Sequence, residues 1–319
     1  EIIFTSGTTH SINMVASGFS KILKDGDEVL VSALEHHSNI VPWQMLCEKT
    51  GATLKVIPMT EKGELSLTDF TLLLSQKTKL VFVNHVSNTL GTINPIKTII
   101  DKAHEKGAAV LIDGAQATSH LTPNFEKLNV DFYVTSAHKM CGPTGVGILY
   151  GKEKWLQELP PYQGGGEMIK EVSFEKTTYA DLPHKFEAGT PNIAGGIAFG
   201  AAIDYLNSIG LKKIATYENE LLNYATKELT KIDGVKIYGT SSNKTAVISF
   251  NIENIHPYDV GTIIDKLGIE VRTGQHCTQP IMDFYKITGT IRASFAFYNT
   301  KQEINVFIEA IKRAKMMLS

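Results

Sequence analysis

Cysteine is scarce in this chain, whose 319 residues include only three thiols. Cys47, Cys141 and Cys277 are too few and too scattered for a disulfide framework, so we expect a reducing compartment. In such a compartment a thiol is either inert or reactive, and we expect Cys47 to be core because it lies in an amphipathic stretch. No spacing of His, Cys and Asp matches a metal site, so we expect no metal.

An excess of charge of either sign is also missing. The chain has 31 Lys and Arg against 33 Asp and Glu, a formal net charge of −2, which argues against a general nucleic-acid binder. No apolar run approaches the roughly 18 residues of a membrane helix, and no signal peptide is visible, so we expect no membrane partner and a cytoplasmic protein. The chain opens without Met in what reads as the middle of a structure, and we interpret it as N-terminally truncated.

The sequence does contain short apolar runs that alternate with amphipathic stretches over its first two-thirds. Five runs are expected to be strands, at residues 28–32, 54–57, 79–83, 108–112 and 131–134. Several are apolar nearly throughout, as parallel strands covered on both faces are, and a sixth run at 145–150 is expected to be antiparallel. This alternation predicts an α/β fold whose mainly parallel sheet forms a large domain, residues 1–206.

The pattern changes near residue 207, from which we predict a smaller α+β C-terminal domain, residues 207–319. Its expected helices are residues 211–232, 258–267 and 303–318, and its expected strands are 235–238, 246–250, 269–272 and 290–297. The preceding residues 164–192, with Gly, Pro and Thr, are expected to form an extended loop region.

Polar side chains follow four of the expected strands, at the ends where an open parallel sheet binds its ligands. These clusters are Glu35 to Asn39; Asn84, His85 and Asn88; Asp113 and Gln116; and Ser136, His138 and Lys139. Helix caps and turns explain part of any one cluster but explain all four together poorly. We therefore expect one binding site at this edge of the sheet.

Two further features leave alternatives open. Ser6-Gly7-Thr8-Thr9 precedes a helical stretch expected at residues 12–23, where free N–H groups and hydroxyls suit a phosphate, although hydroxyl residues at a helix start are also common caps. Cys277 lies beside His276 and near Arg272, which favour an ionised, nucleophilic thiol, whereas many buried thiols are inert.

Seven segments resemble the SufS-type, group II cysteine desulfurases, members of the class V aminotransferase family of fold type I pyridoxal phosphate (PLP) enzymes. They are residues 35–43 (EHHSNIVPW), 85–88 (HVSN), 113–116 (DGAQ), 136–139 (SAHK), 186–192 (FEAGTPN), 272–277 (RTGQHC) and 292–294 (RAS). They span nearly the whole chain in the family's order. The chain departs from the family at Ser6, commonly Arg, at Cys141, often aromatic, and at Gln275, commonly His.

The resemblance implies a cofactor role for most of these positions. Lys139 would be the Schiff-base lysine, Asp113 would pair with the pyridinium nitrogen, and Gln116 would bond the ring hydroxyl oxygen. His36 would stack on the ring and move protons. The phosphate would be held by Thr8, Thr9, Ser136 and His138, with Thr190 from a neighbouring subunit.

The resemblance also implies the substrate and the reaction. Asn88 and Arg292 would take the substrate carboxylate, and Arg272 would order the site near Cys277. Lys139 would take the α-proton of L-cysteine, and the Cys277 thiolate would attack the substrate sulfur, giving an enzyme persulfide and L-alanine. The implied partners are a second copy of the chain and a sulfur-acceptor protein of the SufE or SufU type, in iron-sulfur cluster assembly.

Three other readings compete with this one. A selenocysteine lyase or another class V enzyme would share Lys139, Asp113 and His36, and L-selenocysteine is an alternative substrate. A non-catalytic sulfur relay using only Cys277 is disfavoured by the intact Lys139, Asp113 and Gln116 set. A nicotinamide-dependent oxidoreductase is disfavoured because the chain lacks a G-x-G-x-x-G fingerprint.

Overall fold

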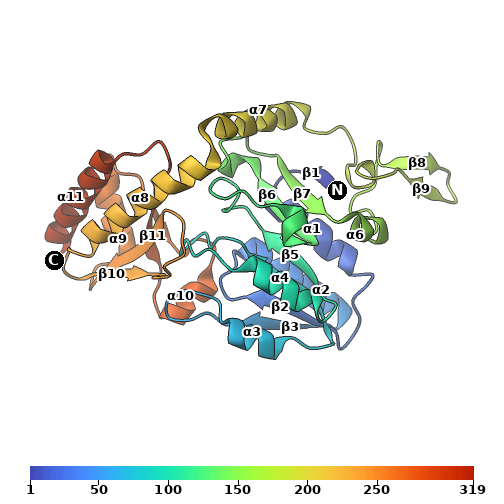
Figure 1. The fold of residues 1–319 in the computed structure, drawn as a ribbon, viewed down its shortest axis with the longest axis horizontal. Helices are drawn as coiled ribbons and strands as arrows, with labels where there is room; N and C mark the ends of the chain where they lie inside the picture. Colours follow the sequence, from blue (N-terminus) through green and yellow to red (C-terminus); the bar gives the residue numbers. More distant parts are fainter.

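A computed structural model describes residues 1–319 and contains one large sheet, one smaller sheet and a separate hairpin (Figure 1). The large sheet has seven strands in the order β1-β7-β6-β5-β4-β2-β3. Their bounds are β1 Ile2–Thr5, β2 Glu28–Ser32, β3 Thr53–Ile57, β4 Thr78–Asn84, β5 Ala109–Asp113, β6 Phe132–Ser136 and β7 Gly147–Gly151. The pairs among β2 to β6 are parallel, whereas β7 is antiparallel to both β6 and β1. The predicted α/β fold is therefore confirmed.

The central strands are apolar on both faces because helices cover both faces. On β4, Leu80 and Phe82 belong to one buried cluster and Val81 and Val83 to another. Helices α1 (Thr8–Phe19) and α2 (Val41–Thr50) contribute to the first cluster, and α3 (Leu67–Leu73) and α4 (Ile96–His104) contribute to the second. This arrangement leaves the carboxyl ends of the strands as the open edge of the sheet.

The smaller sheet is antiparallel, with the order β10-β11-β13-β12. Its strands are β10 Val235–Tyr238, β11 Val247–Ile252, β12 Arg272–Gly274 and β13 Thr290–Ser294, and its helices are α8 Leu211–Leu229, α9 Pro257–Asp265 and α11 Lys301–Leu318. The three helices and the strands β11 and β13 share a buried cluster of 19 residues, against which β10 packs. The small α+β unit that the sequence predicts is thus present.

The two units are joined by direct hydrogen bonds as well as by the chain. The Ile93 amide donates to the Asn243 carbonyl at 2.9 Å, and the Thr245 amide donates to the Gly91 carbonyl at 2.9 Å. Helix α10 (Gln279–Tyr285) packs Ile281 into the core cluster of the large sheet. We call this set of contacts the seam.

Several elements differ from the prediction. Helix α1 begins at Thr8 rather than at residue 12, and the strand expected at 269–272 begins only at Arg272. The expected loop at 164–192 contains a hairpin, β8 Ile169–Val172 and β9 Thr177–Tyr179, that projects from the body (Figure 1). Helix α7 (Ile193–Ile209) was not predicted and runs across residues 206 and 207, so the domain division there stays a prediction.

The remaining short helices are α5 Phe125–Leu128 and α6 Glu153–Glu158. None of the helices combines the length and apolar content that crossing a membrane requires.

Candidate active site

A pocket of about 470 Å³ lies at the open edge of the large sheet. The four predicted polar clusters meet in it, because β4 ends at Asn84, β5 at Asp113 and β6 at Ser136. Its lining residues are Thr8, Thr9, His36, Ser38, Asn84, Val86, Asn88, Asp113, Ala115, Gln116, Ser136, His138, Lys139, Arg272 and Arg292. Of the predicted site residues, only Cys277 and Thr190 do not line it.

Asp113 and Lys139 bring opposite charges into this pocket. Burial raises the pKa of the Asp113 carboxyl, while Lys139 and the Ala115 amide, which donates to Oδ1 at 2.9 Å, act to lower it. Burial lowers the pKa of Lys139, and the guanidiniums of Arg292 and Arg272 lower it further, against the opposing charge of Asp113. A lysine in this setting loses its proton more readily than one in water, as an amine nucleophile must.

The start of α1 forms one end of the pocket. Gly7 is its N-cap and supplies no side chain, so the first amides of the helix are left for other acceptors. The Thr8 amide donates to Ser136 Oγ at 2.9 Å, and the two hydroxyls lie 2.8 Å apart. A Cβ on Gly7 would lie 3.2 Å from Ser136 Oγ, and its φ of 141° also favours glycine. Hydroxyls and amides at a helix start suit a phosphate.

His36 is neutral and has a defined tautomer. Burial, together with the charges of Lys139, His37 and Arg272, lowers its pKa to about 4. The Ser38 amide donates to His36 Nδ1 at 3.1 Å, so the ring proton resides on Nε2. His36 therefore presents a proton donor rather than an acceptor at Nε2.

Arg292 enters the pocket from β13 with part of its guanidinium unpaired. Nη1 donates to the Asn88 carbonyl at 2.7 Å, and Asn88 Nδ2 donates to the His276 carbonyl at 2.8 Å. Nε is buried without a partner. Burial, with the charge of Arg272, lowers the pKa of Arg292 to about 10, which keeps it charged at neutral pH.

Cys277 lies beside the pocket in a strained turn. His276 and Cys277 have φ angles of 53° and 60°, and consecutive left-handed residues other than glycine cost on the order of 1–3 kcal/mol each. The turn is held from the large domain, since the His37 amide donates to the Cys277 carbonyl at 2.8 Å. Arg272 Nη2 donates to Cys277 Sγ at 3.7 Å, which places a guanidinium at the thiol.

The expected help of His276 to this thiol is wrong. His276 is 2% exposed, its Nε2 bonds Thr290 Oγ1 at 2.8 Å, and burial with Arg292 and Arg272 lowers its pKa to about 3. It is neutral and makes no hydrogen bond to Sγ, so Arg272 is the cation at the thiol. Cys47 is buried, as predicted, and Cys141 is exposed.

Sequence reasoning gave Glu35 no role, although it is fully buried behind the pocket. Its Oε1 accepts the Asn84 amide at 2.8 Å and its Oε2 accepts from Asn39 Nδ2 at 2.6 Å, with Ser32 also bonded to Oε1. Burial raises its pKa to about 8 despite these bonds. Its place in the polar cluster that follows the strand at residues 28–32 was the one sequence signal for it.

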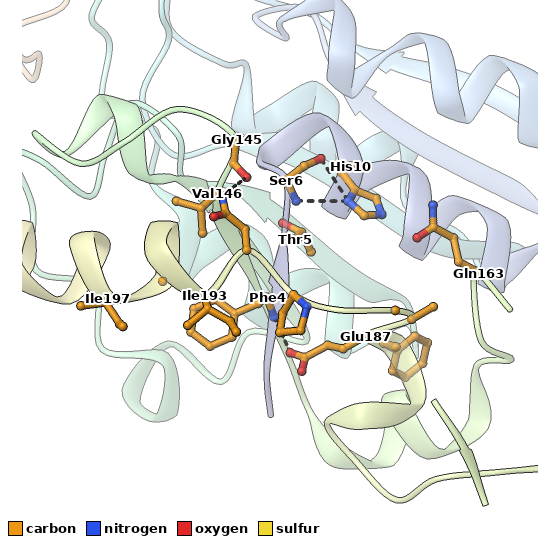
Figure 2. A pocket seen from close by; sticks show the side chains of 16 residues that line it. Phe4, Thr5, Ser6, His10, Gly145, Val146, Gln163, Glu187, Ile193 and Ile197 are labelled. Atoms are coloured by element: carbon orange, nitrogen blue, oxygen red, sulfur yellow. Dashed lines mark hydrogen bonds between the residues drawn. The ribbon is translucent and has the colours of Figure 1, made fainter. Parts of the chain in front are cut away.

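A second pocket, of about 560 Å³, lies near the start of α1 (Figure 2). Ser6 and His10 line it from the start of the chain, and Phe4 lies beside Ile193 of α7, with Ile197 farther along the helix. Thr190 is exposed on the loop that borders it. Lys139 and Asp113 do not line this pocket, so it cannot bind a cofactor in the way that the first pocket can.

Comparisons with known proteins identify the family of the chain. The family model described as aminotransferase class-V matches residues 1–307. The chain belongs to the class V aminotransferase family. This class V member is 47% identical over 316 residues to the probable cysteine desulfurase of Halalkalibacterium halodurans, covering 99% of the chain and 78% of that protein.

Other proteins similar to this chain are also named cysteine desulfurases. It is 49% identical over 320 residues to the cysteine desulfurase of Cronobacter sakazakii, covering 100% of the chain and 79% of that protein. It matches the crystal structure of the Escherichia coli cysteine desulfurase CsdA with a TM-score of 0.95 and 37% identity, covering 100% of the chain and 79% of that structure. The predicted resemblance to cysteine desulfurases is confirmed.

The class V family depends on PLP, and the first pocket of this member fits that cofactor. Asp113 Oδ2 faces no hydrogen-bond donor of the protein, so it can accept the N–H of a pyridinium ring. The uncapped start of α1 with Ser136 suits the phosphate, and Lys139 is the one lysine that lines the pocket. The pocket therefore offers a partner for each of three groups of the cofactor: the ring nitrogen, the phosphate and the aldehyde.

Proposed function

We propose that the chain is a PLP-dependent cysteine desulfurase that converts L-cysteine to L-alanine and keeps the sulfur as a persulfide on Cys277. The observation that carries this proposal is the thiol of Cys277, with Arg272 Nη2 at 3.7 Å, beside a pocket that holds Lys139 and Asp113. An aminotransferase needs the pocket but has no use for the thiol.

The pocket residues divide the first part of the reaction between them. PLP, when bound, supplies an electron sink for the pair left on the substrate Cα after proton loss. Lys139 Nζ would receive that proton, since burial and two guanidiniums lower its pKa. The Arg292 guanidinium, whose Nη2 makes no hydrogen bond to the protein, and Asn88 would bind the substrate carboxylate.

The remaining residues would complete sulfur transfer. The Cys277 thiolate attacks the substrate sulfur, so that an S–S bond forms as the substrate C–S bond breaks. Overall, L-cysteine and the Cys277 thiol give L-alanine and a Cys277 persulfide, a balance that needs no external oxidant or reductant. His36 Nε2 would donate its proton to the substrate carbon from which the sulfur departs.

We further propose a homodimer in which Thr190 serves the partner's phosphate site. Three apolar side chains around the second pocket are exposed in the single chain: Ile193 is 61%, Ile197 72% and Phe4 47% exposed (Figure 2). An exposed apolar face of this kind supports the proposal that a second subunit covers it. The proposed assignment also includes division into domains 1–206 and 207–319, a cytoplasmic location, a SufE- or SufU-type acceptor and a role in iron-sulfur cluster assembly.

Substitution of the thiol tests the activity. Cys277→Ser is expected to bind cysteine yet release no alanine and carry no sulfane sulfur, because a hydroxyl is a far weaker acid than a thiol. Cys141→Ser is the matched control, since Cys141 is an exposed thiol outside the pocket. Alanine would be measured with cysteine and with selenocysteine, and the persulfide would be located by mass spectrometry.

Two outcomes would contradict the proposal. The first is normal alanine release from cysteine by the Cys277→Ser protein. The second is a persulfide found only on Cys47 or Cys141. Alanine formed from selenocysteine alone, by the parent protein, would favour the selenocysteine lyase instead.

A further inference from the structure

His37 is the residue next to His36, and the sequence motif gave it no task of its own. It begins a short 3-10 turn, His37–Asn39, whose N-cap is His36. Its ring lines no part of the first pocket, and the two histidine rings are 6.3 Å apart at an angle of 52°. His37 is therefore placed to act on something other than substrate or cofactor.

The ring of His37 reaches the segment that carries Cys277. The Gln279 amide donates to His37 Nε2 at 3.1 Å, across 242 positions of sequence. Nε2 is thus the acceptor in this bond and carries no proton itself. Gln279 is the first residue of α10, so His37 satisfies an amide that the helix itself cannot.

The backbone of the same residue holds the other side of the turn. The His37 amide donates to the Cys277 carbonyl at 2.8 Å, so one residue bonds both Cys277 and Gln279. The turn between them needs such support because His276 and Cys277 both have left-handed φ angles. Other contacts of the turn come from Asn88 and Thr290 to His276 and from Thr89 Oγ1 to Thr278 Oγ1 at 2.7 Å, but none of these bonds the backbone of Cys277 or Gln279.

We propose that His37 is a positioning residue that clamps the Cys277 turn to the loop carrying His36, through the acceptor Nε2. The clamp fixes where Cys277 Sγ stands relative to the pocket. It rests on the proposed function, because the position of Sγ matters only if Cys277 attacks the substrate. A displacement of about 1 Å at a reacting atom costs on the order of a hundredfold in rate, so a modest loosening of the turn is measurable.

The test compares two side-chain substitutions that leave the backbone bond in place. His37→Leu keeps bulk but removes the acceptor, and His37→Gln keeps an acceptor oxygen within reach of the Gln279 amide. His37→Leu is expected to lower kcat for alanine formation by about tenfold or more, with KM for cysteine and the visible absorption of bound PLP unchanged. His37→Gln is expected to restore kcat to near that of the parent.

A second measurement does not depend on turnover. The alkylation rate of Cys277 by iodoacetamide, measured on the holoenzyme by mass spectrometry, is expected to change in His37→Leu and to return in His37→Gln. Cys141, exposed and outside the pocket, is the internal reference thiol. His256→Ala is the matched control, because His256 Nδ1 likewise accepts a helix-start amide, from Tyr258 at 3.3 Å, at a site remote from the pocket.

The outcomes separate this proposal from the proposed function. Parent-like kcat and Cys277 alkylation in His37→Leu would overturn the clamp, and so would equal impairment of His37→Leu and His37→Gln, which would indicate packing rather than an acceptor. A parent protein that forms no alanine would refute the proposed function, while the alkylation rates would still decide the role of His37.

Discussion

Lys139 and Asp113 illustrate how environment decides the behaviour of single residues in this protein. Each shifts the other's pKa, and burial acts on both in the direction that favours their neutral forms. The two Arg side chains near Lys139 add to the effect on the amine. Cys277 gains its nearby cation from Arg272, five positions away, rather than from the adjacent His276.

Removal of the amine is the most direct test at this scale. Lys139→Ala is expected to lower turnover by more than about a thousandfold and to abolish borohydride-fixable PLP, because no other lysine lines the pocket. The protein is expected to fold, since Lys139 is only half-buried and makes no hydrogen bond that supports the fold. Absorption spectra before and after borohydride, with mass spectrometry of the labelled peptide, provide the measurement.

A second lysine serves as the control. Lys185→Ala is expected to retain fixable PLP, because Lys185 Nζ bonds the carbonyls of Leu156 and Gln157 and lies outside the pocket. PLP that remains covalently fixed in Lys139→Ala, on any other lysine, would overturn the assignment.

At the scale of elements, the turn after β5 is tightly constrained. Gly114 follows Asp113, and a Cβ on Gly114 would lie 1.9 Å from the ring of Tyr133, which is fully buried on β6. Tyr133 is itself fixed, because its hydroxyl bonds His85 Nδ1 at 2.9 Å. The close approach of β5 and β6 at this point therefore requires glycine.

Gly114→Ala is expected to destabilise the protein by about 3 kcal/mol, because the buried Tyr133 ring is held by His85 and Phe125, and to weaken PLP retention, because Gly114 directly follows Asp113. Gly200→Ala is the comparison change in α7, where an added Cβ meets nothing within 4 Å in the single chain, and it is measured on protein dilute enough to be monomeric. It is expected to stabilise by about 0.5–1 kcal/mol, as glycine does not favour a helix interior. Urea denaturation measures both, and equal effects of the two changes would refute the steric argument.

Much of the element order could be predicted from sequence, for a reason visible in the structure. Strands such as β4 and β5 are buried on both faces, so their apolar runs stand out. Helix α7 was missed because its apolar and glycine residues surround the helix and give no amphipathic period. Strand β1 was missed because its four residues alternate weakly and pair with β7, far along the chain.

The sequence predicted those site residues that directly follow the strands of the large sheet. Asp113, Asn84 and Ser136 are found where their strands stop, and this follows from the fold class alone. The roles of these residues came from the family resemblance rather than from spacing. The ring bond of His37 and the three bonds of Glu35 could not be predicted, because each depends on packing between distant segments.

At the scale of the whole molecule, buried histidines set the response to acid. Burial lowers the pKa of His85 and, with neighbouring charges, that of His36 to about 4, and that of His276 to about 3. Between these values and 6.5 the unfolded chain binds more protons than the folded one, so stability rises with pH. Glu35 acts in the opposite direction, since its raised pKa means that its contribution is lost as pH rises from 4.5 to about 8.

A single substitution isolates one of these contributions. His85→Asn retains a partner for Tyr133 but removes a titrating group, so the free energy of unfolding should depend less steeply on pH between about 4.5 and 6. The expected change is up to one proton, about 1.4 kcal/mol per pH unit. Urea titrations of parent and variant across this range measure it. Parallel pH profiles would show that His85 titrates normally in the folded protein.

The seam has a kinetic consequence. An enzyme that closes one lobe over its substrate needs a hinge, a few residues that absorb the rotation while contacts across the cleft separate. Here the bonds from Ile93 to Asn243 and from Thr245 to Gly91 would break together, at about 1 kcal/mol each, and Ile281 would leave a core. The seam therefore opposes rotation of the two units, and we expect the entrance to the pocket to keep its width when a ligand binds. Selection among ligands would then fall to the side chains that already line the pocket.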